Sequence, residues 1–143
     1  PQAMVDGQYP AIGSNREAVE AALQMARKDK HLPLSAEYDA AGRPQKLLIP
    51  GLKPWQGEAT IWLCFYDKRH DVTVERGENR GKLLTYVNVA RSWADLGRWS
   101  GEALSLDLTQ RLGDYNWQEK GAVILVQASR GGPILGAIDL GRR

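Results

Sequence analysis

The alternation of apolar and polar residues over the first twelve positions predicts a β-hairpin. Two short extended segments, residues 2–6 and 9–12, flank the dipeptide Asp6-Gly7. This dipeptide is typical of the tight turns that join neighbouring antiparallel strands. The chain is therefore expected to begin with a hairpin that turns near Gly7.

A single amphipathic helix is expected after the hairpin. Ser14 and Glu17 have the spacing of a capping box, in which the hydroxyl accepts from the backbone of Glu17 while that carboxylate reaches back. The helix should extend to about Asp29, because basic side chains near that point suit the negative end of the helix dipole. Its apolar stripe consists of four residues at helical spacing: Val19, Ala22, Leu23 and Ala26.

From residue 32 onward the apolar spacing changes to the period of two that strands show. Residues 59–66 are apolar at nearly every position, which is typical of a strand covered on both faces. Residues 83–93 also fit a helix, but they are rich in good strand formers, and we interpret them as a strand.

Turn-forming residues separate the predicted strands from one another. About eight strands are expected after the helix: residues 34–38, 46–49, 59–66, 72–75, 83–93, 103–108, 122–128 and 134–140. One helix followed by many short strands predicts the α+β class, with a β-rich, sandwich-like and mostly antiparallel portion.

Composition excludes several classes of function. The 143 residues suit one average domain, and 43% apolar and 25% charged residues are typical of soluble globular proteins. The 19 basic and 17 acidic side chains are too balanced to predict nucleic acid or an anionic membrane as a partner. No apolar run approaches the roughly 20 residues of a membrane span. We interpret Arg142 and Arg143 as a frayed basic tail.

Side chains that carry chemistry are sparse. Cys64 is the one cysteine, so the chain has no internal disulfide, and its apolar surroundings predict a buried thiol. His31 and His70 with that thiol are fewer than the four ligands of a structural zinc site. Asp67 and Asp71 flank a predicted turn and are interpreted as a solvated corner. We therefore predict no catalytic residue, no metal and no cofactor.

The most distinctive segment is residues 76–89, where charges, an amide and two glycines lead into an apolar stretch. Three polar residues at its turn suit an anion, although bonding to the local backbone is the favoured interpretation. Two further polar residues are expected to share a strand face as buried structural partners. The binding candidates, in that order, are Glu78, Asn79 and Arg80, and then Tyr86 and Asn88.

Tryptophan is frequent, with five rings in the chain. Trp62 lies in an apolar segment and is expected in the core. Trp55, Trp99 and Trp117 fall in or near predicted loops, where they either cap the ends of a sandwich or form a stacking surface for sugars. We favour capping, with the ring nitrogens bonded to carbonyls.

Two stretches of the sequence resemble a known family. The first is similar to the last β-hairpin and last helix of a thioredoxin-like domain and comprises residues 1–7, residues 11–14 and the predicted helix. The second comprises residues 59–63, 76–89, 96–99 and 132–137. Together they resemble the C-terminal part of a family of bacterial secreted or periplasmic proteins of unknown function with a thioredoxin-like fold.

The resemblance implies a partial thioredoxin-like segment at residues 1–30 and a β-rich domain at residues 31–143. Such proteins resemble thioredoxin in carrying a Cys-x-x-Cys pair at the first helix, and that half of the domain is absent here. Pro1 would correspond to the usually cis proline that faces the dithiol, so Pro1 and Gln2 join the binding candidates. A periplasmic or secreted location is also implied, and we interpret the start at Pro1 as a processed or truncated product.

An incomplete thioredoxin-like sheet would have an unpaired edge. We expect the edge from Gln2 to Asp6 to pair with a missing N-terminal segment, with the β-rich portion or with a protein partner. Three functions follow as hypotheses. In the first, the chain is part of a cell-envelope thioredoxin-like protein that handles thiols only if its missing half carries the dithiol. In the second, it is a non-catalytic accessory subunit of an envelope complex. In the third, it is a carbohydrate-binding β-sandwich.

Overall fold

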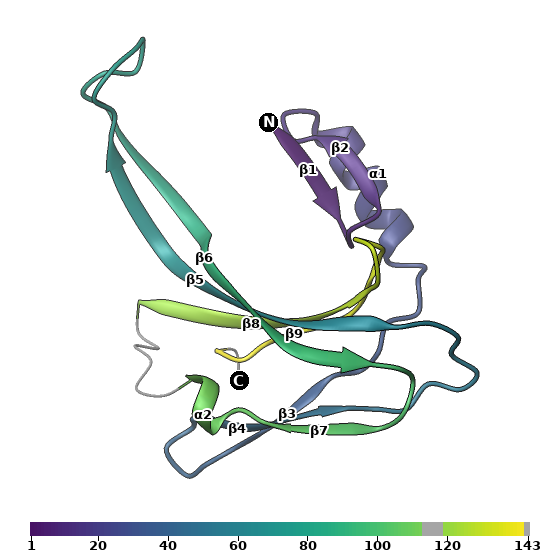
Figure 1. Ribbon diagram of the computed structural model, residues 1–143. Coiled ribbons are helices and arrows are strands. Elements are labelled where there is room, and N and C mark those ends of the chain that lie inside the picture. Colours follow the sequence, from purple (N-terminus) through teal and green to yellow (C-terminus); the bar gives the residue numbers. More distant parts are fainter. Residues whose placement is uncertain (113–118, 142–143) are drawn as a thin grey trace.

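The computed structural model describes residues 1–112 and 119–141 (Figure 1). The expectations for Trp117 and for the terminal Arg142 and Arg143 lie outside the described residues. Strands dominate the described chain, and their pairings are antiparallel. The described helices include none that is long and apolar enough to cross a membrane.

The predicted N-terminal hairpin is confirmed. Strands β1 (Gln2–Val5) and β2 (Tyr9–Ile12) form a two-stranded antiparallel sheet of their own. Asp6 and Gly7 adopt left-handed backbone conformations, with φ of 50° and 70°. Asp and Gly tolerate this conformation better than most residues, which is why the turn forms at this dipeptide.

Helix α1 (Arg16–Ala26) follows the hairpin and packs against it. The predicted cap at Ser14 was wrong by one residue, because the side chain of Asn15 accepts from the Ala18 amide at 3.1 Å. An asparagine oxygen satisfies an unpaired amide of the first turn as well as a serine does. Ala22 is buried, as the predicted stripe requires.

The β-rich portion consists of two sheets that enclose a common core (Figure 1). The three-stranded sheet has the order β3-β4-β7 and comprises β3 (Ser35–Tyr38), β4 (Pro44–Ile49) and β7 (Leu104–Asp107). The four-stranded sheet has the order β6-β5-β8-β9 and comprises β5 (Ala59–Thr73), β6 (Leu83–Trp99), β8 (Lys120–Ala128) and β9 (Ile134–Asp139). A short helix, α2 (Thr109–Leu112), follows β7. The sandwich-like prediction therefore agrees with the observed architecture.

Apolar residues from both sheets fill the space between them. The innermost side chains have at most 2% of their surface exposed and include Leu47 and Ile49 on β4, Ile61 and Leu63 on β5, and Ile124 and Val126 on β8. Trp99 closes one end of this core, and its indole Nε1 donates to the Glu102 carbonyl at 2.6 Å. The capping interpretation is thus confirmed for Trp99.

Strands β5 and β6 are longer than the sequence pattern predicts. Residues 67–71 were expected to form a turn, but β5 continues through them in register with β6. The pairing of β5 with β8 ends at Asp67, so the two-stranded ribbon beyond it has water on both faces and accommodates polar residues. We call residues 68–88 the arm, and Figure 1 shows it extending away from the sandwich.

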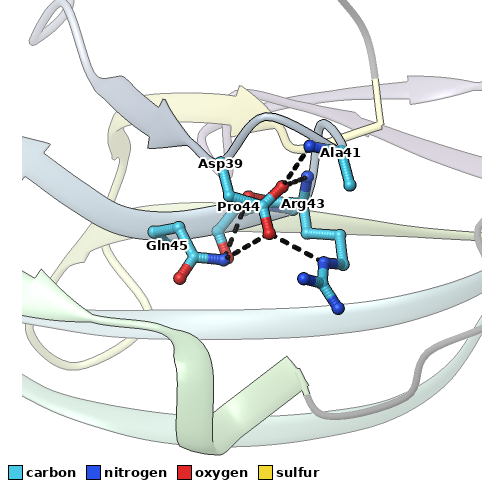
Figure 2. A network of polar contacts seen from close by, with 5 residues as sticks. All are labelled: Asp39, Ala41, Arg43, Pro44 and Gln45. Carbon is cyan, nitrogen blue, oxygen red and sulfur yellow. Dashed lines mark hydrogen bonds and ion pairs between the residues drawn. The ribbon is translucent and has the colours of Figure 1, made fainter.

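The turn between β3 and β4 is held by one carboxylate, as Figure 2 shows. Asp39 Oδ1 accepts from the amides of Ala41 and Arg43 at 2.9 and 2.8 Å, and Oδ2 accepts from Arg43 Nε at 2.8 Å. The Gln45 amide lies 3.4 Å from Oδ2. These bonds, led by the Arg43 amide, lower the pKa of the Asp39 carboxyl.

Asp39→Asn is expected to lower the melting temperature at neutral pH. The folded pKa of Asp39 lies below its ordinary 3.8, so its bonds stabilise the fold above that value and are lost as pH falls through the folded pKa. Melting temperatures of wild type and variant should therefore differ at neutral pH and converge as the pH falls through the lowered pKa of Asp39. Glu20→Gln, which alters an exposed helix pair with Arg16, is the control. A difference that stays constant across this pH range would contradict the assignment.

Candidate functional site

Cys64 is buried, as predicted, and is not placed for nucleophilic chemistry. Only 3% of the residue is exposed, and burial raises the pKa of its thiol. A thiol with a raised pKa carries little thiolate, the form that attacks or binds metal. Within residues 1–112 and 119–141, no cluster of three or more His, Cys, Asp or Glu side chains could hold a metal ion.

Asp67 and Asp71, interpreted from the sequence as a solvated corner, are ion-paired on the ribbon of β5 and β6. Arg91 Nε donates to Asp67 at 2.6 Å. Asp71 accepts from the Thr85 hydroxyl at 2.6 Å and from Arg69 Nε at 3.1 Å. The Thr85 bond first, and then Arg69, lower the pKa of Asp71 and keep it ionised. Both carboxylates therefore act as cross-strand or same-strand partners, the role expected of charged pairs on a ribbon.

Glu78, Asn79 and Arg80 occupy the tip of the arm and are exposed. Lys82 Nζ donates to Asn79 Oδ1 at 3.0 Å, and the Arg80 amide donates to the Gly77 carbonyl at 3.0 Å. Local bonding, which the sequence favoured, is thus present at Asn79 and in the turn backbone. Binding by these three residues stays a prediction.

Tyr86 and Asn88 lie on the arm, and their expected burial was wrong. Tyr86 is 49% exposed, and Asn88 is exposed with a left-handed φ of 53°. The reason is that, among the described residues, β8 pairs with β5 only as far as Asp67 and no other strand covers the ribbon here. Asparagine is one of the few residues that adopt this backbone conformation readily.

Pro1 and Gln2 lie on the N-terminal hairpin, and Figure 1 shows this hairpin and the arm tip as separate regions. The Pro1 carbonyl accepts from the Gly13 amide at 2.8 Å, which closes the open end of the hairpin. A shallow depression of about 390 Å³ lies beside them and is also lined by residues of β2. The structure therefore does not unite the two groups of sequence candidates into one site.

The outer edge of β1 is open, whereas that of β2 is blocked. Ala3 pairs with Ala11, and Met4 pairs with Pro10. Hydrogen-bonded and non-bonded residue pairs alternate along an antiparallel ladder, and the bond from the Gly13 amide to the Pro1 carbonyl shows that the pair at Pro1 is a bonded one. The N–H and C=O groups of Gln2 and Met4 therefore point away from β2. By the same alternation Pro10 occupies the outer edge of β2, where it offers no N–H donor.

Bonds on both sides of the hairpin turn hold it against β9 and against the segment that follows α1. Asp6 is central, because its carbonyl accepts from the Ile134 amide at 2.8 Å and its carboxylate lies 2.8 Å from His31 Nε2. Tyr9 donates to Asp29 at 2.8 Å, and this bond is the main cause of the raised pKa of Tyr9. The open edge of β1 therefore has a defined position relative to β9.

Sequence reasoning missed a pocket on the outer face of the four-stranded sheet. It has a volume of about 450 Å³ and is lined by Gly7, Trp62, Trp93, Leu125, Gln127 and Ile134. Trp62, expected in the core, is only partly buried, and Trp93 is 54% exposed. Ile61 and Leu63 point inward and leave Trp62 on the other face, but β5 is apolar at nearly every position, so its sequence carries no signal that separates the two faces.

The fold defines a β-rich protein whose described residues hold open strand edges and a pocket on the outer face of the four-stranded sheet. The chain belongs to a family of proteins of unknown function, DUF1223, whose model matches residues 1–127. The search of curated proteins found no significant match.

A solved structure shows the same fold. The crystal structure of a protein from Agrobacterium tumefaciens is similar to this chain with a TM-score of 0.74 and 19% sequence identity. The match covers 100% of this chain and 62% of the Agrobacterium protein, so this chain spans less than two thirds of that protein's length. At this identity the similarity establishes the fold alone.

Proposed function

We propose that this chain is the non-catalytic, β-rich portion of a thioredoxin-like protein of the bacterial cell envelope, located in the periplasm or secreted. In this proposal the outer edge of β1 receives a strand from the thioredoxin-like part. The observation that carries the proposal is the asymmetry of the hairpin. Gln2 and Met4 direct backbone donors and acceptors outward, while Pro10 blocks the other edge.

Two further observations support this function. The order β1, β2, α1 is that of the last hairpin and helix of a thioredoxin-like domain, the part that this sequence resembles. The Agrobacterium protein with this fold is longer than the chain, so a protein of that kind has further segments. A two-stranded sheet is marginally stable alone, and a third strand on β1 would extend it.

Thiol chemistry does not belong to this chain in the proposal. Cys64 is its one cysteine and is buried, and thiol–disulfide exchange requires an accessible thiolate. Any such activity requires a dithiol in the thioredoxin-like part. The accessory-subunit hypothesis uses the same edge of β1 with a separate protein. For the carbohydrate hypothesis, Trp99 is 2% exposed and offers no stacking face, whereas Trp93 at the outer pocket is 54% exposed.

Hydrogen exchange at β1 tests the proposal. In the 143-residue chain produced alone, the amide of Met4 should exchange fast, while those of Ala3 and Val5 should be protected by β2. In the native protein isolated from the periplasmic fraction, Met4 should become protected as well. Ala3 and Val5 serve as internal controls in both samples.

One outcome of this exchange experiment would disprove the proposal. If Met4 exchanges equally fast in the native protein, no strand is added to β1 and the proposal is wrong. A native protein that contains only this chain and binds a separate protein at Met4 would instead favour the accessory-subunit hypothesis.

A further inference from the structure

A second open edge lies far from β1, on the outermost strand of the four-stranded sheet. β6 has β5 on one side, and the described residues place no strand on its other side. Three irregularities interrupt this free edge: the left-handed Asn88, and register shifts that leave Arg91 and Leu96 without a partner on β5. Such bulges hinder an incoming strand. The regular stretch that remains is residues 83–87.

Every second residue of this stretch directs its backbone N–H and C=O groups away from β5. The Val74 amide donates to the Lys82 carbonyl at 2.9 Å, so the pair at this position is hydrogen-bonded. Hydrogen-bonded and non-bonded pairs alternate along an antiparallel ladder. The N–H and C=O groups of Leu83, Thr85 and Val87 therefore point away from β5 and are free to pair with another strand.

The side chains of this stretch are unusually apolar for an exposed edge. Leu83 is 62% exposed, Val87 is 68% exposed and Tyr86 is 49% exposed. Natural edge strands are commonly protected by lysine, proline or a bulge, and residues 83–87 contain none of these. The protection of β6 begins only at Asn88.

We propose that residues 83–87 pair in antiparallel fashion with the same residues of a second copy of this chain, around a two-fold axis at Thr85. The stretch is self-complementary in this register: Leu83 faces the partner's Val87, Leu84 faces the partner's Tyr86, and Thr85 faces the partner's Thr85. Apolar side chains meet on both faces of the ribbon, and no like charges are opposed. A two-fold interface of this kind closes on itself and yields a dimer.

The backbone pattern supports the same register. A two-fold axis at Thr85 places the outward-directed N–H and C=O groups of one copy opposite those of the other copy. Three facing residue pairs would then each exchange two hydrogen bonds. A centre at Leu84 or Tyr86 would form only two such pairs within residues 83–87, because the central pair would then be a non-hydrogen-bonded one. A centre at Val87 would require pairing through the left-handed Asn88.

Disulfide trapping tests the proposed axis. Facing residues of a hydrogen-bonded pair have Cα atoms about 5.5 Å apart, within the range that a disulfide spans. Thr85→Cys should therefore form a covalent dimer under mild oxidation. Thr73→Cys is the matched control, because Thr73 lies on β5, where it pairs with Leu83 of β6, and the β6 strands of both copies separate it from its counterpart in the proposed dimer. Cys64 is buried and should not cross-link in the wild type. Equal cross-linking of the two variants would overturn the proposal.

Light scattering tests the uncrosslinked protein. Five residues a side make a small interface, so a dissociation constant between about 1 µM and 1 mM is expected. Thr85→Pro should abolish the dimer without unfolding the ribbon, because the lost amide is directed outward; unchanged circular dichroism checks the fold. A wild-type chain that stays monomeric up to about 1 mM, or a Thr85→Pro chain that dimerises equally, would show that this edge does not self-associate.

Discussion

Trp99→Ala is expected to lower the free energy of unfolding by about 3–5 kcal/mol, the usual cost of removing a large aromatic core side chain. The ring is 2% exposed, and its centroid lies 5.7 Å from that of Trp55. Truncation leaves a cavity between the sheets and removes the donor that satisfies the Glu102 carbonyl. This loss is a large share of the total free energy of unfolding of a domain of ordinary stability.

Urea denaturation followed by circular dichroism measures the effect without relying on the indole signal. Trp93→Ala is the matched control, because Trp93 lies on the same strand but is 54% exposed. Its cost should stay below about 1 kcal/mol. Comparable losses from the two substitutions would contradict the placement of Trp99 at the closed end of the core.

Gly121→Ala is expected to cost about 1–3 kcal/mol through overpacking. A Cβ at this position would lie 2.2 Å from Tyr66 Cζ and 2.4 Å from the Tyr66 hydroxyl oxygen. The Tyr66 ring crosses directly over Gly121 to donate its hydroxyl to Asp139 at 3.0 Å. An alanine therefore forces the ring out of the position in which it links β5 to β9.

A double-mutant cycle identifies the cause. In a Tyr66→Ala background the ring is gone, and Gly121→Ala should cost less than about 0.5 kcal/mol in urea denaturation. Gly13→Ala is a control, because its Cβ would meet only ordinary contacts at 3.5 Å. An unchanged cost of Gly121→Ala in the Tyr66→Ala background would show that the Tyr66 ring is not the obstacle.

Local signals in the sequence were enough to predict the parts of the fold that depend on neighbouring residues. The turn at Asp6-Gly7 was predicted because its conformation depends on those two residues alone. The continuation of β5 through residues 67–71 was missed, because charged residues in a row are as typical of a turn as of a ribbon with water on both faces. Only the end of the β8 pairing at Asp67 distinguishes the two.

The candidate surfaces depend on tertiary arrangement and were harder to predict. Trp62 was expected in the core because its segment is apolar at nearly every position, yet it lies on the outer face beside Trp93. Which face of a central strand is covered depends on the number of layers, and the sequence of that strand does not contain this information. The open edge of β1 was expected from the resemblance, but the blocking role of Pro10 required the register of the hairpin.

The anchoring of the N-terminal hairpin has a consequence for the order of events during protein synthesis. Asp6 bonds to Ile134, and the Leu32 amide donates to the Leu135 carbonyl at 2.6 Å, so the hairpin and α1, which are synthesised before the two sheets of the β-rich portion, are held by β9. Until β9 has emerged, the hairpin and α1 lack these two backbone bonds to the sandwich. Contacts of such long sequence separation form late in folding. A chain that stops before Ile134 would therefore present a detached hairpin and an uncovered apolar helix face to proteases.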